Sequence, residues 1–124
     1  MIDAEDCCLI VEDNYLIFTD IEDIVMASGF KRIDHASTLA EAGTLLEKNR
    51  YRLALLDFRL GVLDSLPLVE TLMKSKIPFA VTTGYPVDEY MLHALKGAPV
   101  ISKPYVTPTV NRVIAGLLSA DRAM

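Results

Sequence analysis

Four short, mostly apolar runs, each followed by polar residues, constrain the fold of this chain more than any other feature. They cover residues 7–11, 53–56, 79–81 and 99–102. Runs of this length that are apolar on both faces are typical of strands buried in a parallel sheet. Segments of helical length separate the runs, and such crossovers require parallel pairing with right-handed connections. The pattern therefore predicts an α/β domain.

The segments between the runs carry the spacings and caps of amphipathic helices. Helices are expected over residues 14–28, 38–49, around 68–73, 88–97 and 107–118, and a further strand over residues 31–36. Gly29 ends the first helix as its C′ residue, and Thr38 opens the second with a capping box. Thr107 caps the last helix, with Pro108 at its first position. We expect a loop over residues 58–65, and five strands alternating with five helices in one domain over residues 1–124.

Length, composition and charge fit a single intracellular domain. At 124 residues the chain is close to the commonest domain size. Its apolar runs are far shorter than the ~20 residues of a membrane helix, and its acidic N-terminus lacks the basic region of a signal peptide. We therefore expect a cytoplasmic protein without membrane contact. The net charge of −5, with no stripe of Lys or Arg, argues against nucleic-acid binding.

Neither the cysteines nor the histidines form a metal-ligand pattern. Cys7 and Cys8 are adjacent in a strand, where side chains alternate between faces, so we expect two reduced, buried thiols rather than a disulfide. His35 and His93 each stand alone, one in an edge-like strand and one on a helix. We expect structural or solvent-exposed roles for both histidines.

Chemically active side chains follow the four core strands directly. Glu12 and Asp13 follow the first run, Asp57 ends the second, Thr83 follows the third and Lys103 the fourth. In a parallel α/β sheet the carboxyl ends of the strands lie along one edge, where ligands bind. We therefore expect these five side chains to converge on one site.

An acidic cluster of this kind needs a cation. Three converging carboxylates repel one another, and Mg²⁺ prefers such oxygen ligands while keeping several waters. We expect Asp13 and Asp57 to bind the ion directly and Glu12 to act through water. An Asp carboxylate can also attack a phosphoryl group. In that chemistry Lys103 would pair with the phosphate, and the Thr83 hydroxyl would donate to another of its oxygens.

At this point the chain resembles, over essentially its whole length, the receiver domain of two-component response regulators. The resemblance rests on Glu12-Asp13, Asp57, Thr83 and Lys103-Pro104-Tyr105, in that order. It implies that these are the acidic metal pair, the phosphoacceptor, the switch hydroxyl and the Lys before Pro. It also implies that the Arg59 backbone carbonyl completes the Mg²⁺ ligands. The implied fold is flavodoxin-like (CheY-like), a doubly wound five-stranded parallel sheet in the order 2-1-3-4-5 with helices on both faces.

Two segments distinguish this chain within the family it resembles. Val100 stands where many receivers place a Tyr or Phe that swings inward on activation. Residues 78–85 look like the corresponding segment of the stand-alone FAT GUY receivers, with Val81-Thr82 in place of Phe-Ala. Arg59 and Tyr85 occupy positions that in this family influence how fast the phosphate is lost, and we hypothesise that their bulk makes that loss slow.

The resemblance implies a single-domain response regulator. Asp57 would accept a phosphoryl group from a histidine kinase or a histidine phosphotransfer protein, and the domain would catalyse only its own phosphorylation and dephosphorylation. Phosphorylation would then change the binding of a downstream protein through the fourth and fifth helices, residues 88–97 and 108–118.

Two alternative functions stay open. One is a phosphorylation-independent protein-binding module with a receiver fold. The other is a Mg²⁺-dependent phosphatase with Asp57 as nucleophile. Against the phosphatase, haloacid-dehalogenase-like enzymes place a second Asp two residues after the nucleophile, where this chain has Arg59.

Overall fold

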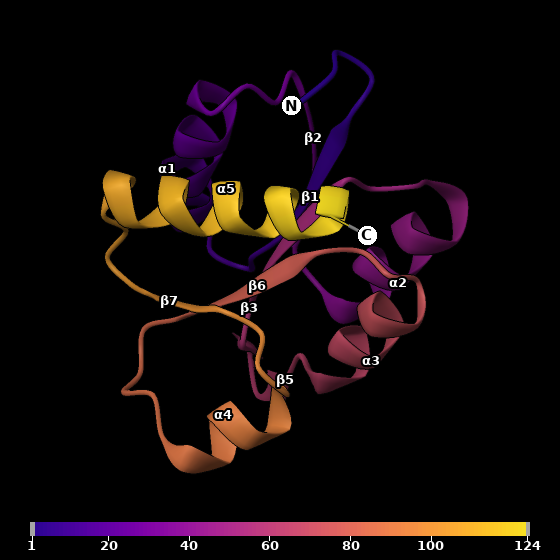
Figure 1. Ribbon diagram of the computed structural model, residues 1–124. Coiled ribbons are helices and arrows are strands. Elements are labelled where there is room, and N and C mark those ends of the chain that lie inside the picture. Colours follow the sequence, from indigo (N-terminus) through magenta and orange to yellow (C-terminus); the bar gives the residue numbers. More distant parts are fainter. Residues whose placement is uncertain (1, 124) are drawn as a thin grey trace.

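A five-stranded parallel sheet forms the centre of the computed structural model, which describes the backbone of residues 2–123 and the side chains up to residue 120. The strands are β1 (Cys7–Val11), β2 (Arg32–Ala36), β3 (Leu53–Asp57), β6 (Phe79–Thr83) and β7 (Val100–Ser102). They lie side by side in the order β2-β1-β3-β6-β7 (Figure 1). This order confirms the predicted flavodoxin-like fold, because β6 and β7 are the fourth and fifth strands of the sheet.

Five helices cover the two faces of the sheet. They are α1 (Tyr15–Ala27), α2 (Leu39–Lys48), α3 (Leu66–Lys74), α4 (Glu89–Ala94) and α5 (Thr107–Ala123). Side chains of α1 and α5 pack with one face of the sheet, and those of α2, α3 and α4 with the other. Figure 1 shows the arrangement of the helices around the sheet. None of the helices in the described part of the chain is long and apolar enough to cross a membrane.

Successive side chains of β3 alternate between the two hydrophobic cores, one on each face of the sheet. Leu53 and Leu55 pack with α1 and α5, whereas Ala54 and Leu56 pack with α2, α3 and α4. All four side chains are at most 1% exposed. A strand buried on both faces has no solvent side, which explains why its sequence is apolar without interruption until Asp57.

Side-chain caps begin α1, α2 and α4 within a few residues of the preceding strand. The Asn14 side chain accepts a hydrogen bond from Ile17 N–H at 3.1 Å, and Asp88 accepts one from Met91 N–H at 2.8 Å. Thr38 caps α2 as expected, but its capping box is altered: the Glu41 carboxylate accepts from Ser37 N–H instead of Thr38 N–H. Because Asn14 caps α1, Glu12 and Asp13 lie in the short turn between β1 and α1.

Two local expectations were wrong. The segment expected to be a loop contains a short hairpin, in which β4 (Arg59–Leu60) pairs with β5 (Leu63–Asp64) in antiparallel fashion. Gly61 has φ 67° at the turn, a conformation that glycine adopts at little cost. Helix α5 also begins one residue earlier than expected, since Val110 N–H donates to the carbonyl of Val106 at 3.1 Å. Thr107 therefore lies in the first turn rather than at the cap.

The two cysteines differ in burial. Cys8 is fully buried, as expected, whereas Cys7 is only half-buried. Both thiols are free, and burial raises the pKa of each. They are therefore poor nucleophiles at neutral pH.

Candidate functional site

The carboxyl ends of β1, β3, β6 and β7 meet at one pocket. Strand register aligns these ends, because Val11 pairs with Leu56, Asp57 with Thr82 and Thr83 with Ser102. The pocket has a volume of about 490 Å³. It is lined by Glu12, Asp13, Asn14, Ile17, Asp57, Arg59, Gly61, Gly84, Tyr85 and Lys103. Four of the five side chains expected at the site thus line it, and the fifth, Thr83, lies next to it in sequence.

Three carboxylates form a cluster suited to a cation. One oxygen from each of Glu12, Asp13 and Asp57 lies within 4.8 Å of the other two. Glu12 and Asp57 are buried, whereas Asp13 is exposed. An all-oxygen, anionic donor set open to solvent on one side fits a hard divalent ion that retains water, such as Mg²⁺. The residues present therefore fit the metal expected from the sequence.

Lys103 connects the two buried carboxylates. Its Nζ atom lies 2.7 Å from Glu12 Oε1 and 3.0 Å from Asp57 Oδ2. Burial alone would lower the pKa of Lys103, but the hydrogen bonds to Glu12 and Asp57 and the negative charges of these two carboxylates together outweigh burial and raise it. The amine is consequently an ammonium ion at physiological pH, and it places a fixed positive charge beside Asp57.

Burial raises the pKa of Glu12. Its hydrogen bonds from Lys103 and from the Asn14 backbone oppose that rise, while the nearby Asp57 charge adds to it. One ammonium ion faces three carboxylates, so the cluster keeps an excess of negative charge. A cation in the pocket would relieve this repulsion.

A backbone N–H fixes an oxygen of each carboxylate. Asn14 N–H donates to Glu12 Oε2 at 3.1 Å, and Gly61 N–H donates to Asp13 Oδ2 at 3.0 Å. Arg59 N–H approaches Asp57 Oδ1 at 3.4 Å. Asn14 and Gly61 were not predicted as site residues. The capping role of Asn14 was a usable signal, whereas the contact between Gly61 and Asp13 left no local signal.

Thr83 is held by hydrogen bonds to the loop that follows β6 and to Lys103. The side chain is 1% exposed, and its hydroxyl accepts a hydrogen bond from Tyr85 N–H at 3.0 Å. The Thr83 carbonyl accepts from Lys103 N–H at 2.7 Å. The backbone of Thr83 therefore positions Lys103, while its hydroxyl is bonded to the β6–α4 loop.

Arg59 and Tyr85 stand together at the mouth of the pocket. The Arg59 guanidinium lies 5.9 Å from the Tyr85 ring centroid and 6.0 Å from that of Phe58. Both residues also line a neighbouring cavity of about 660 Å³ with Tyr90 and Val62. Val62, at the hairpin turn, is 93% exposed. The pocket is thus flanked by a cation held against aromatic rings.

The remaining predicted residues occupy separate environments. Val100 lies half-buried on the edge strand β7, paired with Val81. His93 is exposed on α4, in agreement with expectation. His35 is more closely involved with the site than expected, because its Nε2 atom lies 2.8 Å from the Glu12 carbonyl oxygen.

Comparison with protein families gives one match over most of the chain. The family described as "Response regulator receiver domain" matches residues 8–114. A comparison with curated protein sequences gives no significant match.

Solved structures with this fold include close matches in length. SdrG from Sphingomonas melonis Fr1 is 31% identical, with 94% of this chain and 99% of that chain covered and a TM-score of 0.79. A CheY-like response regulator receiver domain protein from Methanospirillum hungatei JF-1 is 24% identical, with coverages of 95% and 97% and a TM-score of 0.82. The anti-anti-sigma factor PhyR from Bartonella quintana is 26% identical, with 95% of this chain but 50% of that chain covered and a TM-score of 0.82.

We predict that Lys103→Met destabilises the metal-free protein by about 3 kcal/mol at neutral pH, because it leaves the buried Glu12 carboxylate without its cation. Urea unfolding measures this loss. Burial raises the pKa of Glu12, so the folded state favours its protonated form. Lys103 opposes that rise, so Lys103→Met raises the pKa of Glu12 further. The loss is therefore greatest above the pKa of Glu12 in the variant and shrinks as the pH falls through it to the pKa in the wild type.

Lys31→Met is the matched control for this prediction, because Lys31 is exposed. We expect its free energy of unfolding to stay within about 0.5 kcal/mol of the wild type at every pH. Equal stability of Lys103→Met and wild type at neutral pH would contradict the assigned ion pair.

Proposed function

This chain belongs to the response regulator receiver domain family of two-component signalling, and we propose that it is a phosphoryl-accepting switch with Asp57 as the acceptor. The observation that carries the proposal is the environment of the Asp57 carboxylate. It lies 3.0 Å from the Lys103 ammonium group and within 4.8 Å of oxygens of Glu12 and Asp13. It also lines an open pocket that a phosphoryl group can enter.

In the proposed reaction, an oxygen of Asp57 attacks the phosphorus of a phosphohistidine. A P–O bond forms while the P–N bond breaks, and the electron pair remains on the donor imidazole, which takes a proton from solvent. The Lys103 ammonium group pairs with a phosphoryl oxygen as charge accumulates. The Thr83 hydroxyl, which donates to the Tyr85 carbonyl at 3.4 Å, donates to an oxygen of the aspartyl-phosphate instead.

We propose Mg²⁺ as the cofactor, because receiver domains generally bind it and this chain has the acidic cluster to do so. Asp13, Asp57 and the Arg59 backbone carbonyl are the proposed ligands, with Glu12 acting through water. When bound, the ion neutralises charge on the phosphoryl oxygens. The Gly61 and Asn14 amides hold Asp13 and Glu12 in place for this purpose.

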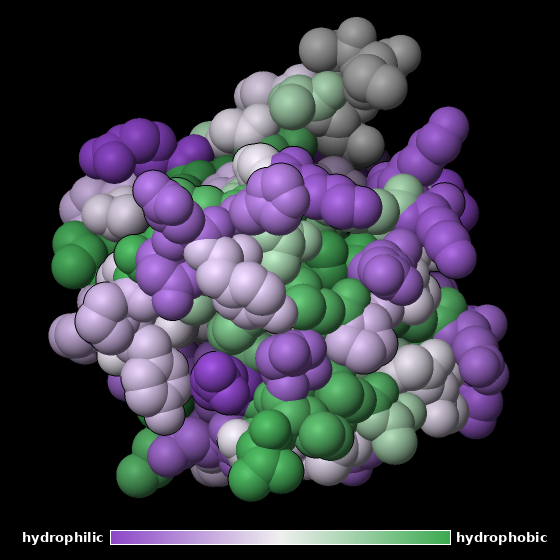
Figure 2. Space-filling view, turned by 90° about the horizontal axis from the view of Figure 1, so that it is seen from below, coloured by the Kyte–Doolittle hydropathy of each residue, from purple (hydrophilic) through white to green (hydrophobic). Residues whose placement is uncertain are grey.

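Phosphorylation would be transmitted through protein binding. A phosphate adds about −1.5 to −2 charge, which is enough to bias a loop between two arrangements. The affected loop is β6–α4, because Thr83 holds it through Tyr85. The proposed output surface is formed by α4 and α5, and on α4 Tyr90 is 65% and Leu92 52% exposed. Figure 2 shows hydrophobic surface bordered by hydrophilic side chains on the side of the molecule that carries α4.

The proposed phosphodonor is a sensor histidine kinase or a histidine phosphotransfer protein. In this scheme the domain catalyses only its own phosphorylation and dephosphorylation. We place the exchange in the cytoplasm, where the free thiols of Cys7 and Cys8 stay reduced.

We predict that incubation with Mg²⁺ and acetyl phosphate adds the mass of one phosphoryl group to the wild type and none to Asp57→Asn. Intact-mass spectrometry detects the difference. Asp64→Asn is the matched control and should be phosphorylated like the wild type, since Asp64 lies in the hairpin that follows Asp57 but outside the acidic cluster. Absence of the adduct with both acetyl phosphate and a phosphohistidine protein would contradict the proposal and favour a phosphorylation-independent binding module.

We predict that Mg²⁺ raises the free energy of unfolding of the wild type by about 3 kcal/mol at a concentration one hundred times its Kd, because it binds the folded state alone. Asp13→Asn should lose most of this gain, since it removes an exposed carboxylate of the cluster without disturbing the core. Urea unfolding with Mg²⁺ or with chelator measures the gain. An equal gain in both proteins would exclude Asp13 as a ligand.

We predict that the double variant Arg59→Ala, Tyr85→Ala loses its phosphate several-fold faster than the wild type, because water reaches the aspartyl-phosphate more easily. The half-life is measured by following the phosphorylated mass after the donor is removed. Tyr90→Ala is the control, because this exposed tyrosine lines the neighbouring cavity and not the Asp57 pocket. A half-life unchanged in the double variant would contradict the screening hypothesis.

A further inference from the structure

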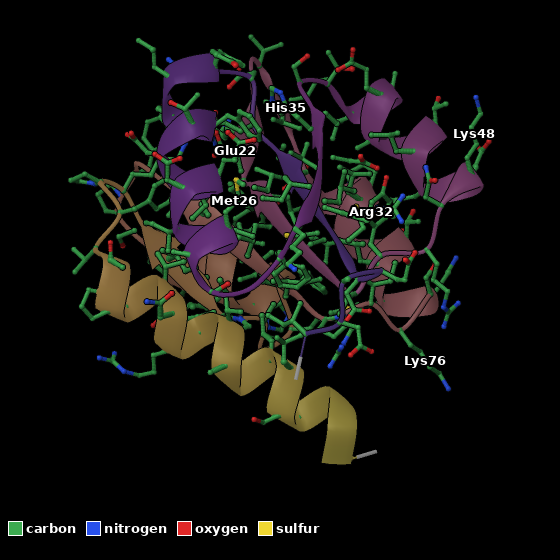
Figure 3. The ribbon with its side chains drawn as sticks, turned by 90° about the horizontal axis from the view of Figure 1, so that it is seen from above. Glu22, Met26, Arg32, His35, Lys48 and Lys76 are labelled. Atoms are coloured by element: carbon green, nitrogen blue, oxygen red, sulfur yellow. The ribbon has the colours of Figure 1, made fainter. Side chains whose placement is uncertain are left out.

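His35 reaches the acidic cluster from β2, a strand outside the four whose ends form the pocket. Its Nε2 atom lies 2.8 Å from the carbonyl oxygen of Glu12. The ring lies beside the N-terminal turns of α1, away from Met26 at the other end of that helix (Figure 3). Neither the expected site set nor the proposed reaction uses this contact.

The direction of this hydrogen bond is fixed by chemistry. A carbonyl oxygen can only accept, so the Nε2 atom must carry a proton and donate it. In the neutral imidazole the other nitrogen, Nδ1, is then unprotonated. The contact therefore demands one tautomer of His35.

Aromatic packing fixes the plane of the His35 ring. The ring stacks on Phe18 with centroids 3.9 Å apart and planes inclined by 11°. Tyr15 lies next to both rings, 5.8 Å from Phe18 and 6.2 Å from His35. Phe18 is buried against the sheet at 5% exposure. Stacking on the buried Phe18 ring therefore restricts the orientation of the His35 ring and of its N–H donor.

The Glu12 carbonyl belongs to the peptide group that connects Glu12 to Asp13. This group is planar and includes the Cα atom of Asp13, so the direction of the carbonyl sets the direction in which Asp13 leaves the strand. β2 holds Glu12 from two positions, because Glu12 N–H donates to the Ala36 carbonyl at 3.0 Å while His35 donates to the Glu12 carbonyl. Asp13 itself is exposed, and Gly61 N–H donates to its Oδ2 atom at 3.0 Å.

From this geometry we infer that His35 is a positioning residue for the metal site: its Nε2–H orients the Glu12–Asp13 peptide group so that the Asp13 carboxylate is held ready for a divalent ion. The inference rests on the metal binding in the proposed function. It adds a residue that touches neither the ion nor the phosphoryl group. Without the N–H, the peptide group must be ordered when the ion binds, and affinity falls.

The test compares two substitutions at position 35 with Mn²⁺ as the probe. His35→Phe keeps an aromatic ring for Phe18 but removes the donor, whereas His35→Gln restores an N–H donor on a flexible side chain. Free Mn²⁺ is measured by electron paramagnetic resonance, and Mg²⁺ by competition. We expect the Kd of His35→Phe to rise about tenfold, and that of His35→Gln to lie closer to the wild-type value.

His93→Phe is the matched control, because His93 is exposed on α4. Its Kd for Mn²⁺ should equal that of the wild type. A wild-type Kd in folded His35→Phe would overturn the inference, as would equal losses in the Phe and Gln variants, since a purely structural role of the ring would not depend on the donor. Loss of stability without a change in Kd would likewise assign His35 a structural role alone.

The wild-type protein provides a second test that does not depend on a variant folding. The ¹⁵N shifts of the His35 ring distinguish the tautomers, and we expect an Nε2 proton that exchanges slowly with water. A neutral ring protonated at Nδ1 would overturn the inference, because it could not donate to the Glu12 carbonyl.

Failure of this inference is distinguishable from failure of the proposed function. If His35 has no positioning role, Asp57 is still phosphorylated in the wild type and Mn²⁺ still binds. If the wild type binds no divalent ion, both the cofactor proposal and the role of His35 are overturned, whatever the result of phosphorylation. At saturating Mg²⁺, His35→Phe should accept a phosphoryl group on Asp57 to the wild-type extent.

Discussion

The ammonium group of Lys103, held between the carboxylates of Glu12 and Asp57, is the interaction on which the site depends. It makes the burial of two acids at the end of the sheet tolerable, because each of them contacts a positive charge within 3.0 Å. It does not complete the neutralisation, since Asp13 adds a third carboxylate. The remaining negative charge of the cluster therefore favours a cation in the pocket.

Hydrogen bonds that involve backbone groups hold Glu12 in place. Glu12 is bonded through its N–H, its carbonyl and both carboxylate oxygens, to Ala36, His35, Lys103 and Asn14. These contacts come from β2, from the residue that follows β7 and from the residue that caps α1. These contacts order Glu12 during folding, so the binding of a ligand does not require a further loss of its conformational freedom.

Sequence patterns predicted the sheet and the residues at the strand ends, because these follow from local rules, whereas the order of the strands was implied by the resemblance to receiver domains. An apolar run such as Leu53–Leu56 has one interpretation in a crossover fold, and strand ends must share an edge. The hairpin after Asp57 has strands of two residues, too short to show a periodicity. The contact of Gly61 with Asp13 joins residues far apart in sequence, so no local pattern indicates it. The contact of His35 with Glu12 was missed for the same reason: an isolated His on an edge strand carries no signal of its target. The roles of the site residues remain predictions that the experiments above test.

The Gly61 N–H that holds Asp13 belongs to the turn of the β4–β5 hairpin, next to the fully exposed Val62 side chain. The hairpin is therefore hydrogen-bonded to the acidic cluster through Gly61, while the neighbouring Val62 side chain is exposed to solvent. Suppose that a macromolecule binds the hairpin with different affinities in the ion-bound and ion-free states. By thermodynamic linkage its binding then changes the affinity for the ion, and the ion changes the affinity for the macromolecule by the same factor. Binding of a macromolecule at this surface turn can thus change the affinity of the acidic cluster for a cation.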